Sequence, residues 1–199
     1  MTGTPPSPRT EVVWDLFVRL FHWTVVGGFA VAYITEGEPL TLHVWAGYVV
    51  AAAVLLRIVW GFIGSPHARF SDFVFPAGKV FSYLRDELRF RAKRHLGHSP
   101  AGGAMVIALL LGLSAISVSG MTLLAVHDGE GPLAAFISQA PPVQGEESPA
   151  VEAWEEIHEV FATLTLILVI FHVAGVALAS HSHKENLVAA MIDGRKRPN

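Results

Sequence analysis

Four long apolar segments constrain this chain more than any other feature of its sequence. They run over roughly residues 16–35, 42–64, 101–126 and 154–180. Each has about the 20 residues that an α-helix needs to cross the ~30 Å of hydrocarbon in a bilayer. Because lipid offers no partner to an unpaired peptide group, we expect each segment to be a helix. The sequence therefore predicts an all-α integral membrane four-helix bundle, with residues 1–199 forming a single domain.

Composition agrees with a membrane location and narrows the chemistry. The chain is 52% hydrophobic and 16% charged, whereas a soluble domain is about 25% charged. It has no cysteine, which excludes disulfides, cysteine-held iron–sulfur clusters and covalent haem attachment. The ten histidines are then the abundant residue type that can bind haem or a transition metal.

The charged residues are strongly segregated along the chain. If the N-terminus is cytoplasmic, all 14 Lys and Arg residues lie in cytoplasmic segments or near the inner helix ends. The two outer loops have none, and ten of the 17 Asp and Glu residues lie in or beside them. This positive-inside pattern predicts four membrane spans with both termini in the cytoplasm. The acidic outer face would suit a cationic partner, unless it only reflects the same bias.

The long connection between the second and third spans predicts an interfacial helix over about residues 78–94. Val80, Phe81, Leu84 and Leu88 recur there at helical spacing, with basic residues between them. Such a helix lies in the membrane surface and meets anionic lipid headgroups. We expect membrane lipid rather than nucleic acid as its partner.

Four histidines lie within the predicted spans, where ionisable residues are costly and usually functional. They are His22, His43, His158 and His172. The last two are 14 residues apart on one helix, so they share a face and are separated by a rise of about 21 Å. In the predicted topology His22 and His172 share an inner level, and His43 and His158 share an outer level.

Two histidine pairs at two depths are what two bis-histidine haems require in a helical bundle. We expect His22 and His172 to ligate the inner haem iron, and His43 and His158 the outer one. Two axial ligands leave no open position on the iron, which favours electron transfer over oxygen binding. The alternatives are hydrogen bonding between helices and a proton relay. Zinc fits less well because neither level gathers three or four ligands.

Three further residues are candidates for the haem surroundings. Gly47 and Gly175 follow histidines closely, and their lack of a side chain would let a porphyrin approach, although small residues also line ordinary helix contacts in membranes. Arg57 lies near the inner level and could pair with a haem propionate; the alternative is an arginine that snorkels to the interface. No catalytic acid–base pair or nucleophile is recognisable.

Several motifs together resemble those of a known family. They are RLFHW at 19–23, HVWAG at 43–47, RIVWG at 57–61, GHSPAGGAM at 97–105, HE at 158–159 and FHVAG at 171–175. The chain resembles, over about residues 13–191, the bacterial di-haem cytochrome b family, which includes the b-type subunit of nickel-dependent hydrogenases. The resemblance implies a quinone-reactive electron carrier with two haem b groups, ligated by the four histidines named above.

Three functions are compatible with these observations. The first is electron transfer between a quinone pool and a periplasmic c-type cytochrome, hydrogenase or other dehydrogenase. The second is a superoxide:quinone oxidoreductase that acts alone, but its anionic substrate would favour a basic outer face, and the outer loops have no Lys or Arg. The third is a haem-bearing membrane anchor subunit. A homo-oligomer is compatible with all three.

Overall fold

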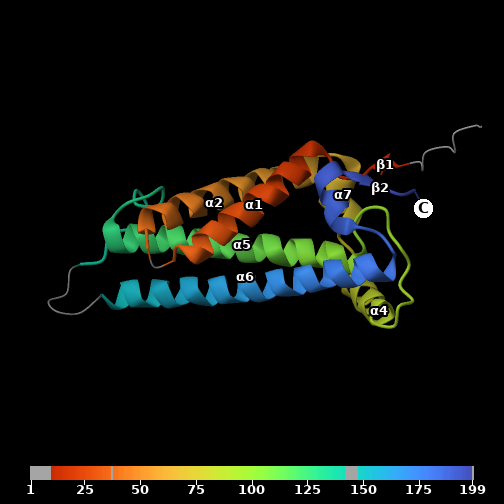
Figure 1. The fold of residues 1–199 in the computed structure, drawn as a ribbon. Coiled ribbons are helices and arrows are strands. Elements are labelled where there is room, and N and C mark those ends of the chain that lie inside the picture. Colours follow the sequence, from red (N-terminus) through yellow and green to blue (C-terminus); the bar gives the residue numbers. More distant parts are fainter. Residues whose placement is uncertain (1–9, 37, 142–147, 199) are drawn as a thin grey trace, which may run out of the picture. The chain divides into compact units, whose positions relative to one another are not determined.

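The computed structural model describes residues 10–36, 38–141 and 148–198; the first nine residues and part of the acidic outer loop lie outside them. Within the described residues, four helices are long and apolar enough to cross a membrane. They are α1 (Leu16–Ile34), α2 (Leu40–Ile63), α5 (Pro100–Asp128) and α6 (Pro149–Ser182) (Figure 1). The predicted all-α membrane class is therefore confirmed.

The ends of these helices follow from local sequence. α1 begins directly after Asp15, whose Oδ1 accepts a hydrogen bond from the Val18 amide at 2.8 Å, as an N-cap residue does. α6 begins at Pro149 rather than near residue 154, because proline lacks an amide hydrogen and suits the first helical turn. α6 is consequently 34 residues long and contains both His158 and His172.

The predicted interfacial helix is shorter than expected. Helix α4 covers Ala77–Glu87, so the helix predicted to reach residue 94 ends at Glu87. Phe90 follows with a φ of 55°, a left-handed conformation that cannot continue a right-handed helix. Phe81 and Leu88 are 71% and 72% exposed, which leaves apolar side chains of this segment open to lipid.

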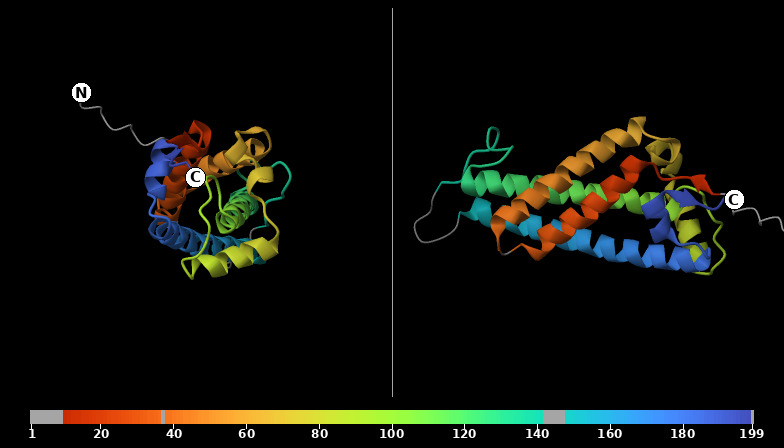
Figure 2. Two further views of the ribbon diagram at one scale, coloured as in Figure 1. Left: turned by 90° about the vertical axis from the view of Figure 1, so that its right-hand side faces the viewer. Right: turned by 45° about the horizontal axis from the view of Figure 1, so that its top comes forward.

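Several short elements complete the chain. A 3-10 turn η1 (Pro66–Ala68) and the one-turn helix α3 (Phe70–Phe73) follow α2. Helix α7 (Leu187–Asp193) follows α6, and Gly194 caps it with a φ of 81°. Strand β1 (Glu11–Val12) pairs antiparallel with β2 (Arg195–Lys196), and α7 lies beside this strand pair (Figures 1 and 2).

The described residues form two compact units, and each is considered by itself. Unit 1 comprises the described residues of Met1–His22, Arg57–Val106 and His172–Asn199. Its core brings together Val13, Trp14, Val18, Ala68 and Ala190, with Trp60, Leu96 and Met191 packed against them. It therefore joins both ends of the described chain to the connection between α2 and α5.

Unit 2 comprises Trp23–Leu56 and Ile107–Phe171. Its buried apolar residues include Ala46, Val50, Ala53, Val54, Leu110 and Leu113. Helices α1 and α2 approach closely at Gly28, where an added Cβ would lie 2.9 Å from Cγ2 of Val50. Small residues permit such close helix contacts in membrane proteins.

Large apolar side chains on the long helices face outward. Ile34, Phe62 and Leu111 are 79%, 71% and 66% exposed. Exposed apolar surface of this kind is unfavourable in water but matches the hydrocarbon of a bilayer. By contrast, the hydroxyls of Ser114 and Thr122 donate to the carbonyls of Leu110 and Val118, which satisfies them without a lipid or water partner.

Candidate cofactor site

Unit 1 brings His22 and His172 together, as the sequence predicts. His22 comes from α1 and His172 from α6, and their ring centroids lie 6.4 Å apart with an interplanar angle of 56°. Both rings are on helices, so their positions are set by backbone that is hydrogen-bonded throughout. The two imidazoles face each other without being in direct stacking contact.

Unit 2 contains an equivalent pair, His43 from α2 and His158 from α6. Their ring centroids lie 6.1 Å apart with an interplanar angle of 77°. The sequence therefore identified both pairs of facing histidines, and the structure assigns each pair to its own unit. Helix α6 contributes one histidine to each pair.

Hydrogen bonds fix the ring orientations in the second pair. Nδ1 of His43 lies 2.8 Å from the carbonyl oxygen of Ala32, and this oxygen can only accept, so Nδ1 carries the hydrogen. Nδ1 of His158 lies 3.0 Å from Oγ of Ser119. The Ser119 hydroxyl donates its own hydrogen to the Ile116 carbonyl at 3.1 Å, so it accepts from His158. In both rings the lone pair of Nε2 is therefore left free to bind a metal.

The separation of the rings fits bis-histidine ligation. An imidazole nitrogen lies about 2 Å from a metal that it ligates, and the ring centre lies roughly 1 Å further back. Two axial imidazoles on one iron therefore have centroids about 6 Å apart. The observed 6.4 and 6.1 Å agree with this requirement. Among the described residues no group of three or more His, Asp or Glu side chains converges on a metal position.

The glycines near the histidines differ in their surroundings. A Cβ added at Gly47 or at Gly175 would meet no heavy atom within 4 Å. Each therefore has open space beside a histidine-bearing helix, as the approach of a flat cofactor would require. Gly120 differs, because its added Cβ would lie only 2.8 Å from Cε1 of His158. Its lack of a side chain makes room for that ring.

Arg57 is buried rather than extended to an interface. The residue is 2% exposed, and its guanidinium lies 5.6 and 5.9 Å from the ring centroids of Phe70 and Phe73. Nη2 donates to the Ala68 carbonyl at 3.0 Å, whereas the buried Nη1 has no hydrogen-bond partner among the described residues. An unsatisfied buried guanidinium nitrogen is costly, and a carboxylate would satisfy it.

Asp15 supplies a negative charge to the same part of unit 1. Its Oδ2 accepts hydrogen bonds from Nε1 of Trp60 at 3.1 Å and from Oγ of Ser65 at 2.5 Å. Burial opposes ionisation, but the hydrogen bonds from Ser65, Val18 and Trp60 outweigh it and lower the pKa of Asp15. The ionised carboxylate attracts the Arg57 guanidinium and holds the start of α1 against the end of α2.

Two residues, one in each unit, have contacts that the spacing of residues in the sequence did not reveal. Ser119 lies in α5, which has no ionisable residue in its apolar part and gave no signal of a role beside His158. His98 lies in the basic connection between α2 and α5, and its ring lies 4.6 Å from the rings of both Trp14 and Phe73. Burial, with added repulsion from Arg57, lowers the pKa of His98 to about 3. Only its place in the GHSPAGGAM motif marked it out.

Long apolar helices with facing histidine pairs are typical of helical membrane proteins that bind haem. The family model of prokaryotic cytochrome b561 matches residues 13–194, and the chain belongs to this family. It is therefore a b-type cytochrome, a membrane protein that carries electrons with haem b, as the resemblance of its motifs implied.

Relatives of known description agree with this family. A probable Ni/Fe-hydrogenase B-type cytochrome subunit of Azotobacter chroococcum mcd 1 is 27% identical over 212 residues, which cover 92% of this chain and 86% of the relative. A probable Ni/Fe-hydrogenase 1 B-type cytochrome subunit of Escherichia coli strain K12 is 25% identical over 216 residues, covering 93% and 90%. No solved structure matches the chain significantly.

Proposed function

We propose that the chain transfers electrons across the bacterial inner membrane, between a quinone pool and a periplasmic redox partner, by means of two bis-histidine haems. The observation that carries this proposal is the presence of two facing histidine pairs with centroid separations of 6.4 and 6.1 Å. When bound, each haem supplies a one-electron iron couple. We assign His22 and His172 to the inner haem and His43 and His158 to the outer haem, within one functional domain of residues 1–199.

The surrounding side chains have separate tasks in this proposal. Ser119 and the Ala32 carbonyl orient the two outer ligands, as hydrogen-bond partners of metal-bound histidines do. Arg57 pairs its free Nη1 with a carboxylate of the inner haem, in place of the partner that the described residues do not supply. Gly47 and Gly175 leave room for the two porphyrins.

An open groove in unit 1 is our candidate for the quinone position. Its volume is about 590 Å³ and its lining includes Val173, Val176, Ala177, Ser180, Lys184 and Glu185. This volume is within the ~300–1,000 Å³ typical of small-molecule sites. The apolar lining starts next to His172, and the polar lining lies toward the end of α6. A quinone ring there would have an apolar environment beside a proposed ligand and polar groups at the other side.

The relatives described as hydrogenase cytochrome subunits favour a hydrogenase as the periplasmic partner. A c-type cytochrome or another dehydrogenase would use the same electron route. The absence of Lys and Arg from residues 23–56 and 107–171 favours a partner with a positive surface, since complementary charge steers encounter. The same absence disfavours superoxide as a direct substrate, because an anion would not be attracted.

Electron transfer in reconstituted vesicles tests the proposal. Vesicles would carry the haem-loaded chain and quinol in the bilayer, with ferricytochrome c added outside. We expect quinol-dependent reduction of the external cytochrome, and we expect it to be lost in His43→Ala and in His172→Ala alike. Activity that survives both substitutions would contradict the proposed route. Quinone reduction driven by superoxide alone, at a greater rate than by a protein donor, would favour the oxidoreductase alternative.

A further inference from the structure

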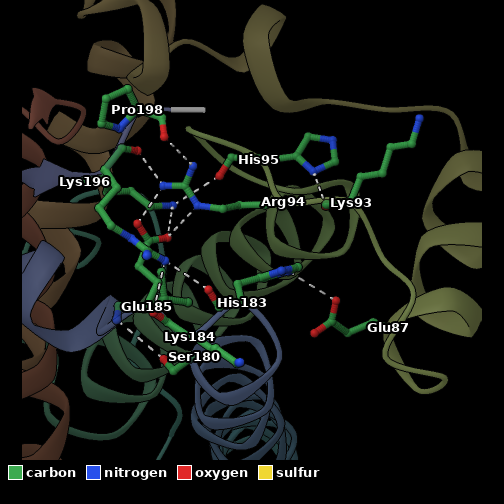
Figure 3. Close-up of polar contacts among 12 residues, drawn as sticks. Glu87, Lys93, Arg94, His95, Ser180, His183, Lys184, Glu185, Lys196 and Pro198 are labelled. Atoms are coloured by element: carbon green, nitrogen blue, oxygen red, sulfur yellow. Dashed lines mark hydrogen bonds and ion pairs between the residues drawn. The ribbon is translucent and has the colours of Figure 1, made fainter. Parts of the chain in front are cut away.

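Unit 1 contains two buried carboxylates with opposite surroundings. The Glu185 side chain is 7% exposed, and Oε1 lies 2.7 Å from Nη2 of Arg94 while Oε2 lies 3.4 Å from Nζ of Lys196 (Figure 3). Burial opposes ionisation of Glu185, but the two cations outweigh it and lower its pKa. Glu185 is thus a fixed anion that ties the segment after α6 to the C-terminal strand.

Glu87, the last residue of α4, has no such compensation. It is 6% exposed, and the hydroxyl of Tyr83 lies within hydrogen-bonding reach of its carboxylate. The nearest basic group is Nε2 of His183, 3.5 Å from Oε2 (Figure 3). A buried carboxylate needs neighbours that can donate a hydrogen bond to it, and the imidazole of His183 is placed to do so.

Tyr83 joins these two groups, one helical turn before Glu87. Its hydroxyl lies 3.4 Å from the same Nε2 of His183. Burial raises the pKa of Tyr83 to about 12, and the charge of Glu87 adds to the rise. Tyr83 therefore stays protonated at neutral pH. His95 packs against it with ring centroids 5.5 Å apart, so the titratable groups facing one another here come from α4, the loop after it and the end of α6.

His183 belongs to the chain segment that lines the groove in which we place the quinone. His183 is adjacent in the chain to Lys184 and two residues from His181, and both of these line the groove. Glu185 is held between two cations, whereas Glu87 faces the imidazole of His183 and the hydroxyl of Tyr83, two groups that can exchange protons.

We propose that Glu87, His183 and Tyr83 form a proton-exchange site that serves the quinone reaction on the cytoplasmic side. This inference rests on the proposed function. Reduction of one quinone would need two electrons, which the haem irons would supply one at a time when bound, and two protons, which would form O–H bonds at the two quinone oxygens. Glu87 gives up each proton through His183 and is then reprotonated from cytoplasmic water. Quinol oxidation would run the same transfers in reverse.

The haem-loaded, pre-reduced chain in detergent tests this proposal when it is mixed with a water-soluble ubiquinone analogue at pH 7. We expect Glu87→Gln to slow haem reoxidation by about tenfold or more, the size of a lost acid–base group, with unchanged haem content. Asp86→Asn is the matched control, because Asp86 is the neighbouring residue of α4 and its side chain is 43% exposed. Its rate should stay within about twofold of the wild type, as expected for a group outside the proton route.

A second readout does not depend on turnover. Redox-induced infrared difference spectra should show a carboxyl C=O band that Glu87→Gln removes and Asp86→Asn retains. His183→Gln, which keeps hydrogen-bonding groups but cannot accept the proton, should slow reoxidation in the same way. Equal rates and an unchanged band in Glu87→Gln would overturn the proton-exchange site alone. Failure of quinone to reoxidise even the wild type would overturn the proposed quinone reaction, and the site's role with it.

Discussion

Units 1 and 2 each hold one facing histidine pair, in surroundings of opposite charge. All 14 Lys and Arg residues belong to the segments of unit 1, whereas unit 2 has none and contains ten of the 17 acids. In unit 2 the protein fixes both imidazoles through Nδ1, using Ala32 and Ser119. In unit 1 the pair shares its unit with the buried Arg57 and its neighbour Asp15.

Because the charges and hydrogen bonds around the two histidine pairs differ, similar ligand geometry need not give equivalent redox sites. Haem potentials depend on nearby charge, hydrogen bonding and burial as well as on the axial ligands. A buried cation favours the ferrous state, because reduction removes one positive charge from the iron. We therefore expect the two proposed haems to have different potentials, with each unit controlling its own.

The largest expected effect is the loss of one haem when one pair is broken. His43→Ala should remove one component of the redox titration and His172→Ala the other, since each substitution deletes an axial ligand in a different unit. Haem content and reduced-minus-oxidised spectra measure this directly. His127→Ala is the control, because this histidine is outside both pairs and hydrogen-bonds Asp128 at 2.7 Å. Loss of both components from either single variant would mean that the units are not independent.

A smaller effect is expected for Ser119→Ala, which touches the unit 2 pair only. Removing the hydrogen-bond partner of a metal-bound histidine typically costs about 10–100-fold in affinity for the metal, so one haem should dissociate more readily while the other stays. Competition with apo-myoglobin would measure the two dissociation rates. Ser114→Ala is the control, because it removes the same kind of hydroxyl from the same helix. The Ser114 hydroxyl donates to the Leu110 carbonyl at 2.7 Å, so its removal should leave both rates unchanged. Equal loss from both sites would contradict the assignment.

A loss of folding stability at low pH is expected from His98 in unit 1. Its pKa of about 3 in the folded protein lies below its ordinary 6.5, so between these values the unfolded chain binds the proton more tightly. The contribution of His98 to folding stability is therefore complete above pH 6.5, and it is lost as the pH decreases toward 3. Between pH 6.5 and pH 5 the loss attributable to this group is about 2 kcal/mol.

Thermal unfolding in detergent at pH 7 and pH 5 measures this contribution. The drop in midpoint between the two pH values should be smaller in His98→Gln than in the wild type. His127→Gln, in unit 2, is the comparison variant and should show the full drop. A pH dependence unaffected by His98→Gln would show that this histidine is not held neutral in the folded chain.

The smallest expected effect is a shift in potential from Arg57. Arg57→Gln should lower one midpoint potential by on the order of 50 mV, close to a tenfold change for a one-electron couple, because it removes a buried positive charge. The other component should not move. Arg85→Gln, whose side chain is 64% exposed, is the control and should change neither potential. If the potential that shifts is instead the one lost in His43→Ala, Arg57 would act on the haem of His43 and His158, contrary to the assignment.

The sequence predicted the long helices and the histidine pairs because both follow simple periodic rules. An apolar run of about 20 residues reports a span, and a spacing of 14 residues places His158 and His172 on one helix face. The end of α4 at Glu87 was missed because it depends on the left-handed conformation of Phe90. The contacts of Ser119 with His158 and of Glu87 with His183 were missed, because helical spacing carries no information on which neighbour a side chain meets.

The number of haem b groups per polypeptide decides whether each histidine pair holds a haem. Purified chain in detergent would be assayed by pyridine haemochrome spectra against amino-acid analysis, with a redox titration of the same sample. We expect two low-spin haems per chain and two resolved midpoint potentials. One haem, or none, would contradict this expectation, and the facing histidines would then have to be interpreted as helix contacts or as a proton path.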